Sequence, residues 1–449
     1  MKNSFKLFAL ATSACLLAGT TACKDFLTAG EVSTDPNRPT VASANRLFVG
    51  VQGSIWALLS SDPVRLAGMY TQQFEGANGQ YTNLYTYGIS ESTTGGFYAG
   101  LYSSGGLVDV RALEAFATAA NDKRYLGIAQ VQEAILIGTG ADLFGDIVYS
   151  QALKGTPNPA LDPQLQVYDA VQALLDKAIA NLADASPTSV GPGAANDLSY
   201  GGSAAKWTKL AHTLKARFYL HTAEVRPAAY ASALAESRLG IKSPADNFNA
   251  VFSGNANEQN YQYQFSVDQR PGYYLPNSFF VNLLKTRNDP RLSDYFNSDQ
   301  SDISDERLTP NYTQPLVTAN ENLLIESEAA YRTGATPEAV TALNAERALT
   351  PGLGAVGVSS GLPLLREILT EKYIALFGSI EIWNDYKRTC FPNVAPPEGA
   401  SGKMPARLLY DTSERNTNTS IPDAAAQPTR NANDPANATD PFGAACLAQ

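Results

Sequence analysis

Two stretches of the sequence combine aromatic rings with side-chain amides, which is the chemistry of a binding site. Residues 70–106 and 255–280 are both rich in Tyr and Phe among Gly, Asn and Gln. A flat ring can stack on the apolar face of a sugar or a peptide side chain, while amides hydrogen-bond hydroxyl groups or backbone. We expect both segments to bind a ligand, with the candidate contact residues Tyr81, Asn83, Tyr85, Tyr87, Tyr261, Tyr263, Tyr273 and Tyr274.

The sequence offers little for nucleophilic or redox catalysis. Gly357–Gly361 matches the G-x-S-x-G nucleophile elbow, which needs a histidine base later in the chain. The two histidines, His212 and His221, both precede it, and we predict them to be surface or packing residues. Gly352–Gly357 matches G-x-G-x-x-G, but a dinucleotide site needs an entering strand, and a helix is expected there. We interpret both glycine motifs as connectors and predict no catalytic residue and no cofactor.

Two histidines also remove the common zinc patterns. The acidic run from Asp299 to Glu306 lacks the glycine and the spacing of a calcium loop. We therefore predict a solvated loop there and no metal site, and calcium binding stays open. The chain carries 43 acidic residues, so a carboxylate pair for glycoside hydrolysis stays open, because such a partnership is spatial and leaves no motif.

The N-terminal residues predict export. Lys2 and Lys6 precede an apolar stretch from Leu7 to Ala18, and small residues then lead into Cys23. A basic start, a short apolar segment and small residues are typical of a signal peptide. We predict residues 1–22 to be a lipoprotein signal and Cys23 to carry the lipid. The alternative is plain secretion with an unmodified thiol.

Two further cysteines, Cys390 and Cys446, remain in the mature chain. In an oxidising compartment an even pair favours a disulfide, which would attach the C-terminal tail to the body. Two separate free thiols are the alternative, because the sequence does not give the distance between them.

The charge balance restricts the partners. The formal net charge is −10, and loss of Lys2 and Lys6 would make the mature chain more acidic still. This composition argues against nucleic acid and against an electrostatic hold on anionic lipid. No later apolar run approaches the length of a membrane span, so the lipid would be the only anchor.

Helical periodicity dominates the elements that must position these residues. Apolar residues recur every three or four positions in the stretches 125–135, 167–182, 207–218 and 362–383. Helices are also expected as closely connected pairs, 104–120 with 124–139 and 320–333 with 336–349. Paired amphipathic helices favour a helical-repeat scaffold of the tetratricopeptide type. One strand is expected where polar and aromatic residues alternate, at Tyr261–Phe265.

A series of ordered landmarks points to a family. They are Cys23-Lys24-Asp25-Phe26-Leu27, Asp142–Tyr149 with Ala152-Leu153, Trp207–Arg217, Asn288–Leu292, Glu371–Phe377 with Trp383–Thr389, and Pro405–Arg407 with Tyr410 and Ser413–Asn416. Together they resemble the SusD/RagB family of outer-membrane nutrient-binding lipoproteins, from Cys23 to about Asn418. Val148 stands where that family usually has proline, His212 stands where it has asparagine, and the tail to Gln449 departs from it.

The resemblance implies a mostly α-helical fold, in which a tetratricopeptide-like scaffold carries long irregular ligand-binding insertions. Residues 23–449 would form one SusD-like domain, with insertions at about 70–106 and 255–280 and an irregular tail from about 396. The protein would be a binding protein and not an enzyme, lipid-anchored at the outer membrane and facing the cell exterior. It would deliver an oligosaccharide or a peptide to a SusC-like TonB-dependent transporter.

Two other functions stay open on the sequence. A helical glycoside hydrolase would need two carboxylates about 5–10 Å apart in one cleft. A helical-repeat scaffold that binds only proteins would pack its aromatic segments inward and would leave no concave pocket lined by polar and aromatic groups.

Overall fold

The helices begin and end at the capping residues and glycines that their sequences provide. The computed structural model describes residues 43–400 and 402–435. Asp122 caps α8 (Lys123–Phe144) by accepting a hydrogen bond from the backbone N–H of Tyr125 at 2.9 Å. Gly334, with φ of +84°, separates α15 (Ala319–Arg332) from α16 (Thr336–Arg347), where a side chain would be strained.

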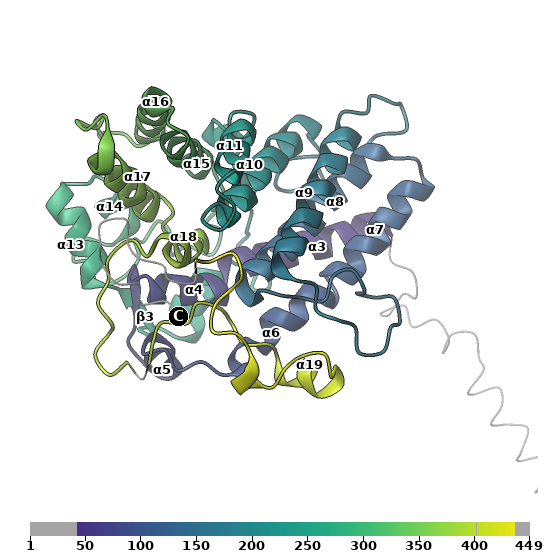
Figure 1. Ribbon diagram of the computed structural model, residues 1–449, viewed down its shortest axis with the longest axis horizontal. Helices are drawn as coiled ribbons and strands as arrows, with labels where there is room; N and C mark the ends of the chain where they lie inside the picture. The colour runs from purple at the N-terminus through teal and green to yellow at the C-terminus, as the bar shows by residue number, and fades with distance from the viewer. Residues whose placement is uncertain (1–42, 401, 436–449) are drawn as a thin grey trace, which may run out of the picture. The chain divides into compact units, whose positions relative to one another are not determined.

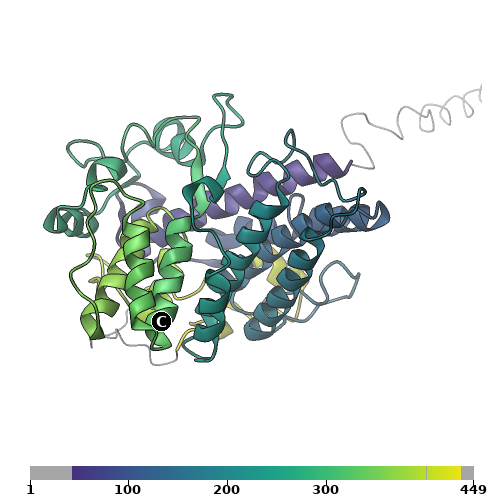
Figure 2. The same cartoon turned by 90° about the horizontal axis from the view of Figure 1, so that it is seen from above.

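A continuous series of helices forms the scaffold. Its members are α7 (Leu107–Ala119), α8, α9 (Gln164–Leu182), α10 (Ala204–Thr222), α11 (Ala229–Ser237), α15, α16 and α17 (Gly361–Ala375). Each helix packs on the next, from α7 on α8 to α11 on α15, and α15 contacts both α16 and α17. The series runs across Figure 1 and is seen from above in Figure 2. It confirms the predicted tetratricopeptide-like helical-repeat scaffold.

The other elements lie between or after the scaffold helices. The helical ones are α3 (Ala44–Ser60), α4 (Asp62–Tyr70), α5 (Gln80–Tyr85), α6 (Glu91–Tyr102), η1 (Pro244–Asp246), α12 (Tyr261–Tyr263), η2 (Gln264–Gln269), α13 (Ser278–Arg287), α14 (Leu292–Tyr295), α18 (Glu381–Thr389), α19 (Thr412–Thr417) and η3 (Ala424–Ala426). The short strands pair antiparallel, β1 (Phe74–Gly76) with β3 (Tyr274–Pro276) and β2 (Phe248–Ala250) with β4 (Gln314–Val317).

The strand expected at Tyr261–Phe265 is wrong. The segment is helical, and η2 is a π-helix. The Asn260 side chain accepts hydrogen bonds from the backbone N–H groups of Gln262 and Tyr263 at 2.9 and 3.1 Å, which caps a helix start. The insertion 70–106 is also more regular than expected, because it contains α5 and α6.

Large aromatic side chains fill the core between the scaffold and the insertions. Trp207 on α10 and Trp383 on α18 are at most 1 % exposed. Their indole N–H groups donate to Asp197 Oδ2 at 2.8 Å and to the Pro405 carbonyl at 3.1 Å. A buried indole needs such a partner, so both tryptophans are packing residues.

Charged side chains join the scaffold helices inside the core. Glu328 on α15 is fully buried and accepts hydrogen bonds from Arg388 on α18 at 2.6 and 2.8 Å and from Lys372 on α17 at 2.9 Å. Glu371 on α17 is equally buried and receives Arg291 and Arg347, each at 2.5 Å. Removal of one partner from a buried ion pair leaves an uncompensated charge, so these pairs hold the helices in one register.

Many of these charged residues belong to the landmarks that carry the family resemblance. Glu371 and Lys372 lie in one landmark, Arg388 in the next, and Asp289 pairs with Arg291 at 2.6 Å within another. The landmarks therefore describe the inside of the scaffold and not the ligand face.

The irregular tail packs against the scaffold. Asn431 donates to the carbonyl of Asp142 at 2.8 Å, and Asn433 donates to the carbonyl of His221 at 3.0 Å. Arg407 donates to the Phe144 carbonyl at 3.1 Å. The tail therefore covers the ends of α8 and α10 with polar side chains.

Several predictions fall on residues outside those described. The signal peptide 1–22, the lipid on Cys23 and the thiol of Cys446 lie there. Cys390 is buried and disulfide-bonded, but its pairing with Cys446 stays a prediction. Chain contacts separate Met1–Arg46 from Leu47–Gln449, and the division into a signal and one domain is likewise still a prediction. Within 43–400 and 402–435, no helix has the length and apolar character to cross a bilayer.

The close packing of α8 on α10 gives a first prediction. A Cβ on Gly138 would lie 2.1 Å from Cζ of Phe218, whose ring is 1 % exposed. Gly138→Ala should lower the free energy of unfolding by about 1–3 kcal/mol through overpacking. Gly50→Ala is the matched control, since nothing lies within 4 Å of that Cβ, and it should raise stability by about 0.5–1 kcal/mol. Urea denaturation followed by circular dichroism measures both. Equal stability of Gly138→Ala and wild type would contradict the packing.

Candidate functional site

The two aromatic segments meet in space, although about 190 residues separate them along the chain. Strand β1 of the first pairs with β3 of the second, with Phe74 opposite Pro276 and Gly76 opposite Tyr274. Next to this sheet, Asn277 donates to the hydroxyl of Tyr85 at 2.8 Å. The segments that were chosen for their composition therefore form one region.

A pocket of about 450 Å³ opens in this region. Helices α4, α5 and α6 supply one part of its lining, and η2 with the residue after it supplies the rest. The lining residues are Asp62, Arg65, Leu66, Gln80, Tyr81, Asn83, Leu84, Thr93, Phe97, Phe265, Gln269 and Arg270. Its volume lies within the range of small-molecule sites.

A buried guanidinium organises the pocket. Arg65 is 5 % exposed, and its Nη2 and Nε donate to Asp62 Oδ1 at 2.5 and 3.0 Å. Nε also lies 3.0 Å from the hydroxyl of Tyr81, which donates to Asp62 at 2.8 Å. Burial opposes ionisation of Asp62, but the charge and hydrogen bonds of Arg65 outweigh it, and the pKa of Asp62 is lowered. Burial is the main cause that raises the pKa of Tyr81, so its hydroxyl keeps its proton.

Aromatic rings cover this polar group. Phe265 lies with its ring centroid 4.2 Å from the Arg65 guanidinium and 4.7 Å from the ring of Tyr81. Phe97 on α6 is half-buried and contributes a further ring to the lining. Phe265 belongs to the π-helix η2, and π-helical turns occur often at functional sites. The pocket thus offers rings, amides and charged groups together.

The eight candidate residues, seven tyrosines and one asparagine, do not all lie at the pocket. Tyr81 and Asn83 line the pocket. Tyr273 lies 6.3 Å from Tyr81, edge to face. Tyr85 lies outside the lining, and its hydroxyl accepts a hydrogen bond from the Asn277 side chain.

Besides Tyr85 and Tyr273, four more candidates lie outside the pocket lining. Tyr87 is 7 % exposed and packs on Tyr70, and Tyr274 is 3 % exposed and stacks on Phe74 at 4.1 Å. Tyr261 packs on Phe252 at 5.4 Å, and Tyr263 is half-buried. Their ligand contacts stay predictions, and the geometry favours Tyr81 and Asn83.

Three charged lining residues, Asp62, Arg65 and Arg270, were neither sequence candidates nor rings or amides of the two segments. Asp62 and Arg65 precede the first aromatic segment with the i, i+3 spacing of a helical ion pair, and that spacing was a usable signal. Arg270 lies within the second segment, where attention to rings and amides missed it.

A second pocket of about 370 Å³ lies elsewhere, next to β4, α14 and the α17–α18 connection. Its Arg307 is already engaged by Asp294 Oδ2 at 2.7 Å, and the rings of Tyr295 and Phe377 lie 5.0 and 5.6 Å from the guanidinium. None of the candidate binding residues lines it, so the Arg65 pocket is the better candidate.

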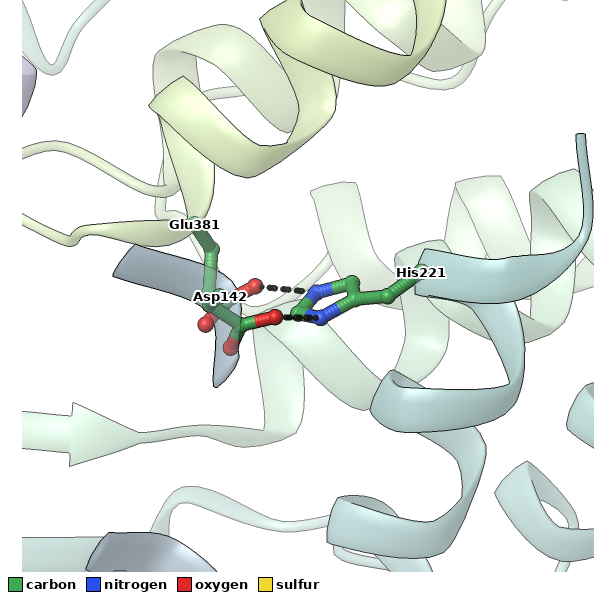
Figure 3. Close-up of side chains that lie close together, drawn as sticks. All are labelled: Asp142, His221 and Glu381. Atoms are coloured by element: carbon green, nitrogen blue, oxygen red, sulfur yellow. Dashed lines mark hydrogen bonds and ion pairs between the residues drawn. The ribbon is translucent and has the colours of Figure 1, made fainter. Parts of the chain in front are cut away.

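One buried cluster has the side chains of a metal site. Asp142 on α8, His221 on α10 and Glu381 on α18 bring their ligand-type atoms within 4.8 Å of one another (Figure 3). His221 Nδ1 lies 2.7 Å from Asp142 Oδ1, and Nε2 lies 2.7 Å from Glu381 Oε2. Both ring nitrogens are therefore engaged by carboxylates.

The charge state of His221 identifies the cluster as an ion pair. Burial lowers the pKa of His221, but the charges of Asp142 and Glu381 outweigh it and raise the pKa to about 9. An imidazolium has no free lone pair for a metal. His221 is therefore a packing residue, as predicted from the sequence, but a charged one that joins three helices.

Comparisons with known proteins agree with the fold. A family model described as "Starch-binding associating with outer membrane", of the SusD-like type, matches residues 36–313. No curated protein matches the sequence.

Solved structures are similar over most of the chain. A SusD/RagB family protein from Bacteroides thetaiotaomicron is 23% identical with a TM-score of 0.67, over 87% of this chain and 97% of the other. A SusD homologue from Bacteroides fragilis is 20% identical with a TM-score of 0.70, over 89% and 99%. A chitin-binding SusD homologue from Flavobacterium johnsoniae is 18% identical with a TM-score of 0.68, over 88% and 99%.

The raised pKa of His221 predicts a pH dependence of stability. The folded pKa, about 9, lies above the ordinary value of about 6.5. The contribution is therefore complete below about pH 6.5 and is lost as the pH rises through about 9. His221→Gln should cost about 3 kcal/mol at pH 6 and much less at pH 9.5. Urea unfolding of both proteins at the two pH values measures the difference. A cost that does not change with pH would show that His221 is neutral in the folded state.

Proposed function

This chain belongs to the SusD-like (SusD/RagB) family, and on that premise we propose that it binds an oligosaccharide in the Arg65 pocket at the cell surface. The observation that carries the proposal is the composition of that pocket. Phe97 and Phe265 supply rings, and the amides of Gln80, Asn83 and Gln269 lie in the same lining. Rings contact the apolar face of a pyranose while amides bond its hydroxyl groups.

A sugar is favoured over a peptide by the relatives. The family model carries a starch-binding description, and a structural neighbour from Flavobacterium johnsoniae is described as chitin-binding. Both are polymers of pyranose units, and both need flat rings and amides. The same groups would accept a peptide, so peptides belong in the binding panel.

A binding role fits the pocket better than hydrolysis. The only carboxylate in the pocket lining is Asp62, and Arg65 and Tyr81 already engage its Oδ1. Glycoside hydrolysis by the common mechanisms uses two carboxylates that flank the scissile bond. The helical glycoside hydrolase is therefore the weaker alternative.

A scaffold that binds only proteins is also weaker. That alternative requires the aromatic segments to pack inward. Tyr87 and Tyr274 do so, but Phe97 and Asn83 line an open pocket. A concave site with rings and amides supports a small ligand.

The location and the partner follow from the sequence landmarks. We propose that a lipid on Cys23 anchors the protein to the outer membrane with the pocket facing the cell exterior. A SusC-like TonB-dependent transporter would receive the bound sugar. The family description, which names association with the outer membrane, supports this placement. Labelling with radioactive palmitate, lost in Cys23→Ser, and co-purification with a transporter test the two parts separately.

Binding measurements on two pocket variants test the function. Phe97→Ala and Gln269→Ala should each weaken binding of an oligosaccharide about threefold to tenfold, because they remove a ring contact or a hydrogen bond. Isothermal titration calorimetry with maltooligosaccharides, chitooligosaccharides and a peptide panel measures this.

Phe116→Ala provides the matched control, since this phenylalanine is exposed on α7 and lies outside the pocket lining. It should bind like wild type. Loss of binding in Phe116→Ala with none in Phe97→Ala would move the site away from Arg65. No binding across the whole panel would refute the function.

A further inference from the structure

The Arg65 pocket carries a surplus of positive charge on an acidic protein. The chain has a formal net charge of −10. The charged residues in the pocket lining, however, are Arg65, Arg270 and the single carboxylate Asp62. Charge in a cleft attracts ligands of the opposite sign, because low-dielectric walls focus its field. The pocket is thus a local cationic site.

Arg65 keeps donor capacity that the protein does not use. Its Nε and Nη2 are bonded to Asp62 and Tyr81, while Nη1 is buried and has no hydrogen-bond partner within the described part of the chain. A buried donor without a partner is unfavourable until an acceptor reaches it. A ligand could reach this donor only if the side chains that bury Nη1 moved, so the exposed Arg270 is the primary contact for an anion.

Arg270 is a second cation that no carboxylate neutralises. Among residues 43–400 and 402–435, no carboxylate oxygen lies within 4 Å of its guanidinium, whereas other arginines have such a partner, for example Arg217, Arg291, Arg347, Arg388 and Arg415. Its Nη1 donates to the Gln269 carbonyl at 2.9 Å, and its guanidinium lies 5.9 Å from the ring of Tyr273. The side chain is exposed and directly follows η2. It is therefore free to meet an anion on a ligand.

From this arrangement we propose that the pocket selects an oligosaccharide that carries carboxylates, that is, uronic acid units. Arg270 would bind the carboxylate as a planar fork, for which guanidinium and carboxylate are matched. Phe97 and Phe265 would contact the sugar ring. This inference rests on the proposed function, since it names the class of sugar that the same site takes.

A neutral sugar would bind in the pocket with lower affinity than an acidic one. It satisfies the rings and amides, but it leaves the charge of Arg270 unpaired. The preference for an acidic sugar should therefore be electrostatic, and it should weaken as added salt screens the exposed guanidinium.

Pairs of acidic and neutral sugars test the inference on the full-length protein. Oligosaccharides of galacturonic, mannuronic and glucuronic acid are each compared with their own methyl esters, which have the same rings and no charge. Titration calorimetry should show at least one acid that binds about tenfold more tightly than its ester in 20 mM buffer. The ratio should fall toward one in 0.5 M NaCl.

Substitution of Arg270 tests the assigned group. Arg270→Gln should lower the affinity for the acid about tenfold and leave the affinity for the ester unchanged, while Arg270→Lys should keep part of the preference. Lys285→Gln is the matched control, because Lys285 is exposed, carries the same charge and lies outside the pocket lining. It should bind both forms like wild type.

The outcomes separate the two proposals. Equal affinity for acids and esters, unchanged in Arg270→Gln, would overturn the acid preference and leave oligosaccharide binding standing. Binding of neutral maltooligosaccharides or chitooligosaccharides alone would do the same. Binding of acidic peptides and of no sugar would overturn both proposals, and so would a failure to bind any of these ligands.

Discussion

A charge buried without an opposite charge costs several kcal/mol, and this fold depends on how it meets that constraint. Glu328 and Glu371 are fully buried, and each holds two cations that come from other helices or loops. The helix that carries Glu371 also holds the segment that leads into the pocket. Tyr373 donates to the Thr71 carbonyl at 2.8 Å, and Gln73 donates to the Tyr373 carbonyl at 2.7 Å. The ion pairs thus set the scaffold, and the scaffold positions the pocket.

The candidate binding region combines a rigid base with less regular walls. Arg65 is held by Asp62 and Tyr81 on one edge and covered by Phe265 on one face. The wall opposite comes from short helical pieces joined by loops, where substitutions disturb little of the core. The central hydrogen bonds therefore belong to the rigid base and do not depend on the less regular walls.

Periodicity and landmark residues predicted most of the scaffold, because amphipathic helices must bury one face and their pattern records which one. The sequence also predicted a common binding function for the two aromatic segments, but not that they pair in space. The secondary structure of these segments and the burial of their individual side chains could not be predicted. Alternation at Tyr261–Phe265 suggested a strand, but capping by Asn260 and the burial of Phe265 on Arg65 favour a helix. Composition could not separate Tyr274, which packs inward, from Tyr81, which lines the pocket. The sequence predicted His221 to be a surface or packing residue. Its charge could not be predicted, because it depends on carboxylates that lie far from it in the chain.

The contact of the tail with the scaffold has a consequence for the order of folding. Asn433 bonds the carbonyl of His221 across 212 positions, and Asn431 bonds that of Asp142 across 289. Contacts of such long sequence separation form late, since the intervening chain must first be brought together. The ends of α8 and α10 therefore remain uncovered until the last part of the chain has been made. During synthesis the carbonyls of Asp142 and His221 lack these partners until residues 431–433 have been made.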